Sequence, residues 1–342
     1  MSLHDFYLQS RQSATHQVWT FSDLQQSDPD LAEQCLTIAV EDMKEIGADF
    51  THLWYLGDAT EGSNPDHTRR MTDMQVKLLG SLNIPLRFVM GNHDLDPTRG
   101  LPPGSTPVLP ATPVLPAYEA FRKVPGWKTT ETPMDIAFTE ILGETLVVFL
   151  SDHVSPDCRW FATQQGICGE FPEEYSHELK VYQQLRKKMA DWPGPVVIAG
   201  HYAFPGGARG TQEGGLPERL LPLPESVKLV LHGHAHIGDL KWGKKDTYQR
   251  VSWVDWHQIP QANISSLDRR RGSQTRSSVL HLQPDGTLAL FFRDHEDARW
   301  SDALFTDATA PRSRSGISAA FHKERNALQG TDLERWQQQH DG

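Results

Sequence analysis

Residues able to bind metal ions follow a glycine at four separate places along the chain. The four strings are Gly57-Asp58, Gly91-Asn92-His93-Asp94, Gly200-His201 and Gly233-His234-Ala235-His236. A fifth segment, Asp23-Leu24-Gln25, comes just after the apolar residues 18–21. Carboxylate oxygens, amide oxygens and imidazole nitrogens are groups that bind divalent cations in proteins. Five such segments, each at a predicted strand end, indicate a hydrolase with two metal ions.

In order and in residue type, the five segments closely resemble the calcineurin-like metallophosphoesterase superfamily. The pattern of that superfamily runs D-x-H, G-D, G-N-H-[DE], G-H and G-H-x-H, and the chain follows it over about residues 17–295. One position departs from it, because Gln25 stands where the pattern has histidine. The resemblance implies an α/β fold, a sandwich of two mixed β-sheets flanked by helices.

The resemblance also implies which side chains hold the two ions. The first ion would be bound by Asp23, Gln25, Asp58 and His236, and the second by Asp58, Asn92, His201 and His234. Two divalent ions about 3.5–4 Å apart clamp phosphoryl oxygens and lower the pKa of a bound water from about 15.7 toward about 7. Ions this close need a carboxylate between them, and Asp58 is the candidate for that bridge. A metal-bound hydroxide would then attack phosphorus in line.

His93 and Asp94 are the predicted catalytic residues. Asn92 already occupies the metal-binding position of its string, so His93 is expected to be free of the ions and to protonate the leaving-group oxygen. A general acid needs a pKa near the working pH, and a neighbouring carboxylate such as Asp94 would raise the pKa of an imidazole by favouring its charged form. This role for Asp94 is a hypothesis.

Gln25 bears on the identity of the metal. A carboxamide oxygen is neutral like imidazole but harder, which favours manganese or magnesium over zinc at the first site. The chain is similar here to the manganese-dependent ADP-ribose and CDP-alcohol pyrophosphatases, which carry D-x-Q and a G-D-x-x-[DE]-G-x-N run. That run is matched by Gly57, Asp58, Glu61, Gly62 and Asn64. We expect two divalent ions, manganese first, with iron, magnesium or zinc as alternatives. The opposing interpretation is a weakened or lost metal site.

The expected substrate is a phosphodiester or phosphoanhydride of a small molecule, and the D-x-Q likeness favours one that contains a nucleotide. A phosphomonoester is the nearest alternative. A scaffold that keeps the fold and binds partners without turnover is a further alternative, but such a protein should have lost His93 or several ligands. Here His93 and every ligand position but one match the pattern.

Composition bears on partners and location. The chain has 342 residues, 38% of them hydrophobic, and a net charge of −11. Nucleic-acid backbones are bound by clustered Lys and Arg, and the single basic cluster, Arg269-Arg270-Arg271, indicates a solvated loop or a contact to an anionic substrate. We therefore expect no nucleic-acid partner. The oligomeric state is not indicated.

Three cysteines, Cys35, Cys158 and Cys168, are too few for a disulfide framework and fit a reducing compartment. No run of about 18 apolar residues occurs, and residues 1–13 lack the apolar core of an export signal. The expectation is a cytoplasmic protein with no membrane partner.

Alternating strands and helices are predicted to position the ligands. Strands at 18–21, 52–56 and 86–90 are separated by helices at about 31–46 and 71–82, the first begun by Asp28-Pro29 and ended by Gly47. Such a βαβαβ unit gives parallel strands with ligands at their carboxyl ends. Strands at 196–199 and 227–231 precede His201 and His234 in the same way.

Further strands predict a second sheet. A hairpin is expected from 136–139 and 146–150, a helix at 173–189, and strands at 249–253, 279–282 and 287–292, the last two joined by Pro284-Asp285-Gly286.

One catalytic domain is expected over residues 1–304, followed by a linker and tail over 305–342. Residues 95–117 form a Pro-rich insert with a tandem repeat of T-P-V-L-P-A. Proline this dense favours polyproline II and excludes helix. The insert is either a rim over the metals or a tolerated duplication in a surface loop.

Overall fold

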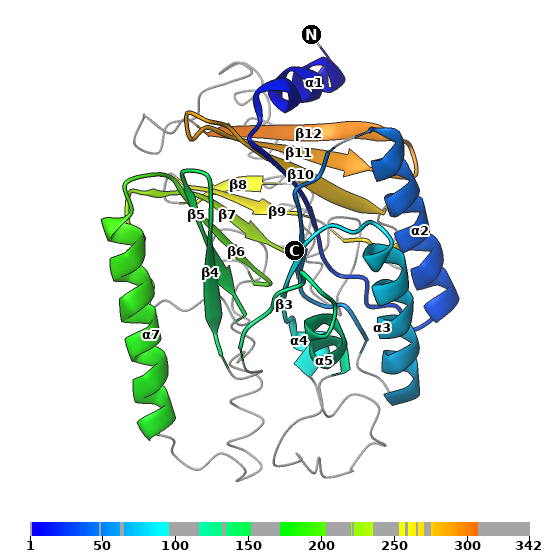
Figure 1. The fold of residues 1–342 in the computed structure, drawn as a ribbon, viewed down its shortest axis with the longest axis horizontal. Coiled ribbons are helices and arrows are strands. Elements are labelled where there is room, and N and C mark those ends of the chain that lie inside the picture. Colours follow the sequence, from blue (N-terminus) through cyan, green and yellow to red (C-terminus); the bar gives the residue numbers. More distant parts are fainter. Residues whose placement is uncertain are drawn as a thin grey trace, which may run out of the picture.

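The computed structural model describes residues 2–47, 49–61, 65–95, 116–131, 135–151, 172–202, 220, 222–234, 253–256, 259–264, 266–269 and 275–306. In this part of the chain two six-stranded sheets lie face to face, with helices on both outer faces (Figure 1). Both sheets mix parallel and antiparallel pairs. The predicted α/β sandwich of two mixed sheets is therefore confirmed.

Sheet A contains the first three strands and the last three. Its spatial order is β12 (Arg299–Thr306), β11 (Leu288–Asp294), β10 (Arg276–Leu282), β1 (His16–Phe21), β2 (His52–Leu56) and β3 (Leu86–Val89). Strands β1, β2 and β3 are parallel, as the βαβαβ pattern predicts, whereas β10 runs antiparallel to β1. The carboxyl ends of β1, β2 and β3 consequently lie at one edge of the sheet.

Sheet B contains the middle of the chain. Its spatial order is β4 (Ala137–Leu142), β5 (Thr145–Leu150), β6 (Val196–Gly200), β7 (Val227–His232), β9 (Ile259–Asn263) and β8 (Trp253–Trp256). The predicted hairpin is the antiparallel pair β4–β5, and β5, β6, β7 and β9 are parallel. The ends of β6 and β7, which precede two of the predicted ligands, are therefore also neighbours.

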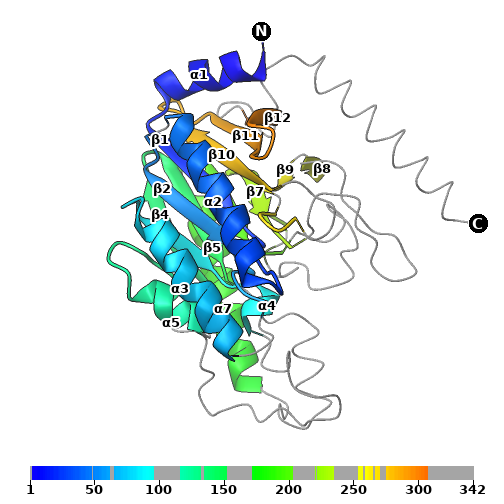
Figure 2. The same cartoon turned by 90° about the vertical axis from the view of Figure 1, so that its right-hand side faces the viewer.

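Helices cover the outer face of each sheet. They are α1 (Leu3–Ser13), α2 (Pro29–Glu45), α3 (Pro65–Gly80), α4 (Asn92–Leu95), α5 (Pro116–Arg122) and α7 (Pro172–Asp191). Figure 2 shows α2 and α3 side by side along sheet A, and α7 lies against sheet B on the opposite side of the molecule (Figure 1). Among the helices of the described ranges, none has the length and apolar character needed to cross a membrane.

Local sequence explains the boundaries of α2. The Asp28 side chain accepts a hydrogen bond from the backbone of Asp30 at 2.9 Å, and Pro29 occupies the first turn, where a missing N–H costs nothing. Gly47, at φ +61°, follows the helix in the left-handed region that favours glycine. Both signals were predicted from the sequence.

The core consists of three apolar layers. The layer between the sheets joins Trp54 and Leu56 of sheet A to Phe149 and Leu231 of sheet B. The rings of Trp54 and Phe149 meet edge to face, with centroids 5.1 Å apart. Each fully buried large side chain of this kind stabilises the fold by about 1.5–3 kcal/mol. The close fit of the two sheets fixes the edge at which the ligand-bearing loops emerge.

One buried ion pair also joins the sheets. The Arg87 guanidinium, on β3, donates from Nε to the Glu140 carboxylate, on β4, at 2.6 Å, and its Nη1 donates to the Gly126 carbonyl at 3.1 Å. Burial would raise the pKa of Glu140, but the contact with Arg87 lowers it below its usual range. Because the remaining Arg87 donors are also bonded, the pair costs less than an isolated buried charge.

Several predicted boundaries differ from the structure. Helix α3 begins at Pro65, six residues earlier than predicted, and β12, ending at Thr306, is a strand that was not predicted from the sequence. The predicted insert overlaps two helices, because Leu95 ends α4 and Pro116 begins α5, where proline is tolerated in a first turn. Of the strand predicted at 249–253, Trp253 is described, as the start of β8. Residues 96–115 and 307–342 lie outside the described part.

Candidate metal centre

The predicted ligand segments follow strands of both sheets and are hydrogen-bonded to one another. The Asp23 N–H, after β1, donates to the Gly57 carbonyl, after β2, at 3.0 Å. The Gly233 N–H, after β7, donates to the His201 carbonyl, after β6, at 3.0 Å. Between the sheets, the His234 N–H donates to the Asp23 carboxylate at 3.0 and 3.2 Å. Four of the five segments are thus fixed relative to one another, by two backbone–backbone contacts and by the Asp23 carboxylate.

Three side chains from these loops form a group that could hold a metal ion. One ligand atom from each of Asp58, His201 and His234 lies within 4.8 Å of those of the other two. Nε2 of His201 is 3.3 Å from Oδ2 of Asp58, and both side chains are 1% exposed. Nδ1 of His201 is hydrogen-bonded to the Leu56 carbonyl at 2.8 Å, so this ring presents its Nε2 to Asp58.

Asp23 and Gln25 lie beside this group. The Gln25 amide nitrogen donates to Oδ2 of Asp58 at 3.0 Å, which places the amide next to the carboxylate that the sequence predicts as a bridge. The Asp23 carboxylate accepts from the Ser22 hydroxyl and from the His234 backbone. Asp23 is fully buried and Gln25 is 1% exposed. Gln25 therefore lies beside the Asp58 carboxylate and contacts it through its amide nitrogen, and its role as a metal ligand through the amide oxygen stays a prediction.

The backbone at three of these residues is strained. Asp23, Asp58 and His234 have φ values of +56°, +56° and +62°, in the left-handed region that non-glycine residues rarely adopt. Such conformations cost about 1–3 kcal/mol each and persist where surrounding structure imposes them, commonly at functional sites. That three predicted ligands share this strain indicates a site built for chemistry.

The glycines of the motifs are required by close approach. A Cβ added at Gly57 would lie 2.6 Å from Nδ1 of His201, and one at Gly233 would lie 2.6 Å from Oδ2 of Asp23. A Cβ at Gly91 would lie 2.5 Å from the Asp58 backbone nitrogen. Real Cβ atoms do not approach this closely, so each glycine lets a loop pass directly against a predicted ligand from another segment.

The electrostatics of the buried groups fit a bound cation. Burial raises the pKa of Asp23 to about 7. Burial would also raise the pKa of Asp58, but the facing imidazoles of His201 and His93 hold it well below its usual range. Burial lowers the pKa of His234 to about 3, helped by His201, which leaves a neutral ring. Burial would lower the pKa of His201, but the Asp58 carboxylate raises it to about 9. Carboxylates and imidazoles are the ligand types that a divalent ion binds, and binding displaces their protons.

His93 lies at the same site, and its acidic neighbour is Glu61. Nε2 of His93 is 4.0 Å from Oδ2 of Asp58, while Nδ1 is 3.8 Å from Oε2 of Glu61 and 3.4 Å from the Glu61 carbonyl. Glu61 is the residue whose position near His93 was not predicted. The sequence feature that could have identified Glu61 is its position three residues after Asp58 in the G-D-x-x-[DE]-G-x-N run.

The Asp94 carboxylate binds backbone N–H groups. Its Oδ2 accepts the N–H groups of Asp58 at 2.8 Å and Gly91 at 2.9 Å, and its Oδ1 accepts those of Ala59 at 2.9 Å and Thr60 at 3.2 Å. The carboxylate is therefore directed at backbone groups of two loops. An effect of Asp94 on the pKa of His93 stays a prediction.

Two predicted ligands cannot be placed. The backbone of Asn92 begins α4, directly before His93, but its side chain lies outside the described residues, as does all of His236. Their metal-binding roles stay predictions.

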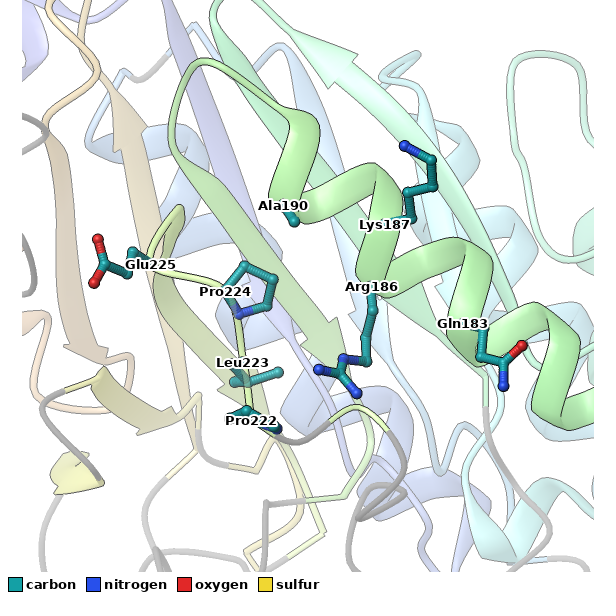
Figure 3. A pocket seen from close by; sticks show the side chains of 8 residues that line it. All are labelled: Gln183, Arg186, Lys187, Ala190, Pro222, Leu223, Pro224 and Glu225. Carbon is teal, nitrogen blue, oxygen red and sulfur yellow. The ribbon is translucent and has the colours of Figure 1, made fainter.

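A separate surface groove of about 460 Å³ lies between α7 and the segment that leads into β7 (Figure 3). Strand β7 separates this groove from His234, because the groove is next to the amino end of the strand and His234 follows its carboxyl end. The groove is therefore no part of the candidate centre. Its lining residues are Gln183, Arg186, Lys187, Ala190, Pro222, Leu223, Pro224 and Glu225.

Comparison with known structures gives neighbours of low identity. A dimetal phosphatase from Danio rerio superposes with a TM-score of 0.53 at 14% identity, covering 86% of this chain and 100% of that chain. The purple acid phosphatase PPD1 from yellow lupin (Lupinus luteus) seeds gives a TM-score of 0.48 at 12% identity, covering 89% and 57%. At such identities the likeness to the first shows the shared fold. No curated protein sequence matches the chain.

The sequence model of one family matches most of the chain. It is described as calcineurin-like phosphoesterase, and it covers residues 16–238, from the first residue of β1 to just past the last predicted ligand. This family implies a centre of two divalent ions. Of the predicted ligands, Asp58, His201 and His234 lie together, and Asp23 accepts a hydrogen bond from the His234 backbone. The protein belongs to the calcineurin-like phosphoesterase family.

Proposed function

We propose that this protein is a dinuclear metal-dependent phosphohydrolase that cleaves a phosphodiester or phosphoanhydride bond in a small, nucleotide-containing molecule. The observation that carries this proposal is the group of Asp58, His201 and His234, with ligand atoms within 4.8 Å of one another. Membership of the family supports phosphoester hydrolysis. The preference for a nucleotide diphosphate rests on Gln25 and on the run that contains Glu61.

The assignment of ligands follows the motif matches. Asp23, Gln25, Asp58 and His236 would hold one ion, and Asp58, Asn92, His201 and His234 the other. When bound, two such ions clamp phosphoryl oxygens and lower the pKa of a water that serves as nucleophile. Manganese is the metal that the Gln25 oxygen favours, with iron, magnesium and zinc as alternatives.

The role of His93 is to protonate the leaving group. Its Nδ1 faces the Glu61 carbonyl and carboxylate, so the proton on Nδ1 is held there, and Nε2 points toward the Asp58 side of the site. A proton on Nε2 is then the one available to the leaving oxygen. Glu61 orients the His93 ring and favours its charged form. From the sequence, this role was predicted for Asp94.

A screen of substrates tests the proposal. The purified chain is reconstituted with Mn²⁺ and assayed on bis(p-nitrophenyl) phosphate, on p-nitrophenyl phosphate and on nucleotide diphosphate esters. We expect turnover of the diester and of the diphosphates to exceed that of the monoester. Faster cleavage of p-nitrophenyl phosphate would instead identify a phosphomonoesterase.

The matched control is His93→Ala. Because a positioned general acid contributes about 10²–10⁴-fold, we expect a loss of turnover in that range with metal content retained. If the parent protein binds well under one ion per chain, the protein is a binding scaffold on this fold. If His93→Ala turns over at the parent rate, the assignment of the acid is wrong.

We further propose a cytoplasmic location and no nucleic-acid partner. The low cysteine content and the net charge of −11 support these proposals. Of the basic cluster at residues 269–271, the described Arg269 is 3.1 Å from Oε1 of Glu296, a pairing that fits a structural loop.

A further inference from the structure

Asp94 binds two ligand-bearing loops at once. Its carboxylate accepts the consecutive N–H groups of Asp58, Ala59 and Thr60, which follow β2, and the N–H group of Gly91, which follows β3. Consecutive N–H groups that point the same way form a small pocket suited to an anion. Here the anion is a side chain of the protein, 9% exposed.

The contact is reciprocal. While Asp94, after β3, accepts the N–H of Asp58, the Asp58 carboxylate accepts the N–H of His93 through Oδ1 at 2.9 Å. Each loop therefore gives a carboxylate to the backbone of the other. Because Oδ1 of Asp58 is occupied by this backbone contact, Oδ2 is the atom that faces His201 and Gln25.

The strained conformation of Asp58 depends on such contacts. At φ +56° this residue costs about 1–3 kcal/mol relative to an ordinary conformation, whereas hydrogen bonds to a charged group contribute about 1.5–3 kcal/mol each. Two of the four Asp94 bonds, those to Asp58 and Ala59, flank the strained torsion directly. Bonds of this kind are of the same order of energy as the cost of the conformation.

From this geometry we infer that Asp94 is a positioning residue for the metal centre: it holds the Asp58 backbone in the left-handed conformation that presents Oδ2 to the ions. The inference rests on the proposed function in so far as ions bind at Asp58. It gives Asp94 no contact with substrate. In this inference Asp94 acts on the Asp58 backbone, whereas Glu61 acts on the His93 ring.

The informative variant is Asp94→Asn. It keeps the shape of the side chain, but one carboxylate oxygen becomes an amide group, whose hydrogens would face two backbone N–H donors. Replacement of groups that orient metal ligands typically weakens metal binding about 10–100-fold, and we expect a loss in that range for Mn²⁺, measured by calorimetric titration of the metal-free full chain. Asp94→Glu keeps the charge and should recover most of the affinity.

A second measurement needs no metal. Amide hydrogen exchange in the metal-free protein should show faster exchange at Asp58, Ala59, Thr60 and Gly91 in Asp94→Asn, with the strands of sheet B unchanged. The control is Leu304→Ala, on β12 at the far edge of sheet A from β3, which should lower stability while leaving Mn²⁺ affinity and these four amides as in the parent.

The outcomes are distinct. Parent-like Mn²⁺ affinity and parent-like exchange in Asp94→Asn would overturn the inference and leave the proposed function standing. A shifted pH–rate profile with unchanged metal affinity would also overturn it, because Asp94 would then act through His93. A parent protein that binds no Mn²⁺ would overturn the proposed function. The exchange experiment would still test whether Asp94 holds the two loops together.

Discussion

A buried ion pair on the outer face of sheet A offers a sharp test of the fold energetics. Asp42, on α2, accepts from Nε of Arg293 at 2.8 Å and from Nδ1 of His295 at 2.7 Å. The Asp42 side chain is 5% exposed and that of Arg293 is 7% exposed. Ser277 continues the chain of bonds, because its hydroxyl is 2.7 Å from Nε2 of His295 and 2.7 Å from Nε1 of Trp19. The network joins α2 to three strands.

Asp42→Ala leaves the Arg293 guanidinium buried without its carboxylate. Loss of one partner of a buried pair costs about 3–5 kcal/mol, and an orphaned donor on His295 adds about 1–3 kcal/mol. We expect a loss of about 4–8 kcal/mol in the free energy of unfolding, out of a typical total of about 5–15 kcal/mol. Arg293→Met should cost less, because His295 still donates to Asp42.

The assay is urea unfolding of the metal-free protein for the parent, both single variants and the double variant. If the pair acts as a unit, the double variant should be at least as stable as Asp42→Ala, because it no longer buries an unpaired guanidinium, and its loss should be far less than the sum of the single losses. Despite burial, Arg293 and His295 lower the pKa of Asp42 below its usual value. Its contribution is therefore complete above about pH 4 and is lost as pH falls through the folded-state pKa. Additive losses, or a single loss below about 1 kcal/mol, would refute the reasoning.

Three further predictions concern pH, the acid and the metal. Burial lowers the pKa of His281 to about 3, so the folded state excludes a proton that the unfolded state binds below about pH 6.5. This residue should therefore lower stability by about 1.4 kcal/mol per pH unit from there toward pH 3, and His281→Gln should make the slope measured by urea unfolding shallower by that amount; an unchanged slope would contradict the prediction. Glu61→Gln should move the alkaline limb of the pH–rate profile to lower pH with metal content unchanged, because the charged form of His93 loses its carboxylate neighbour; an unmoved limb would exclude this role. Gln25→His should shift the preference of the centre from manganese toward zinc in competitive metal loading, and an unchanged preference would show that Gln25 contacts no ion.

Strands near the ligands were predictable because their apolar runs are short and end at glycine. The predicted strand at 52–56 coincides with β2, and those at 196–199 and 227–231 differ from β6 and β7 by one residue at the end. Parallel order followed from the helices between strands, since a crossover connection is what parallel neighbours need. These are local properties, which a single sequence carries.

Elements stabilised by distant contacts were not predictable in this way. Helix α1 is polar, and it is held by Tyr7, whose ring stacks on Trp300 at a centroid distance of 4.2 Å, nearly three hundred residues away. Strand β9 contains Pro260, Gln261 and Asn263, residues typical of loops, yet it is completely buried beside β7. In both cases tertiary packing outweighs local preference.

At the candidate site, residue types were predictable and their contacts were not. Asp58, His201 and His234 could be chosen because carboxylates and imidazoles after glycine are rare in this order, and the structure brings them together. The partner of His93 could not be chosen between Glu61 and Asp94. Both are acidic and close in sequence to predicted ligands, and the choice depends on the path of the loop after β2.

The glycines explain why the motifs are visible in a sequence at all. Gly57, Gly91 and Gly233 have no room for a Cβ, because each lies against a group of the centre that belongs to another segment. Asp94 is itself part of the G-N-H-[DE] string, but its partners are backbone N–H groups, among them those of Asp58 and Ala59, which any residue can supply. Steric constraints therefore fix residue types next to the ligands, whereas the hydrogen bonds that hold the ligand loops are satisfied by backbone groups of any residue. The motif consequently marks Asp94 as a residue type of the pattern, whereas the backbone groups that it binds leave no signal in the sequence.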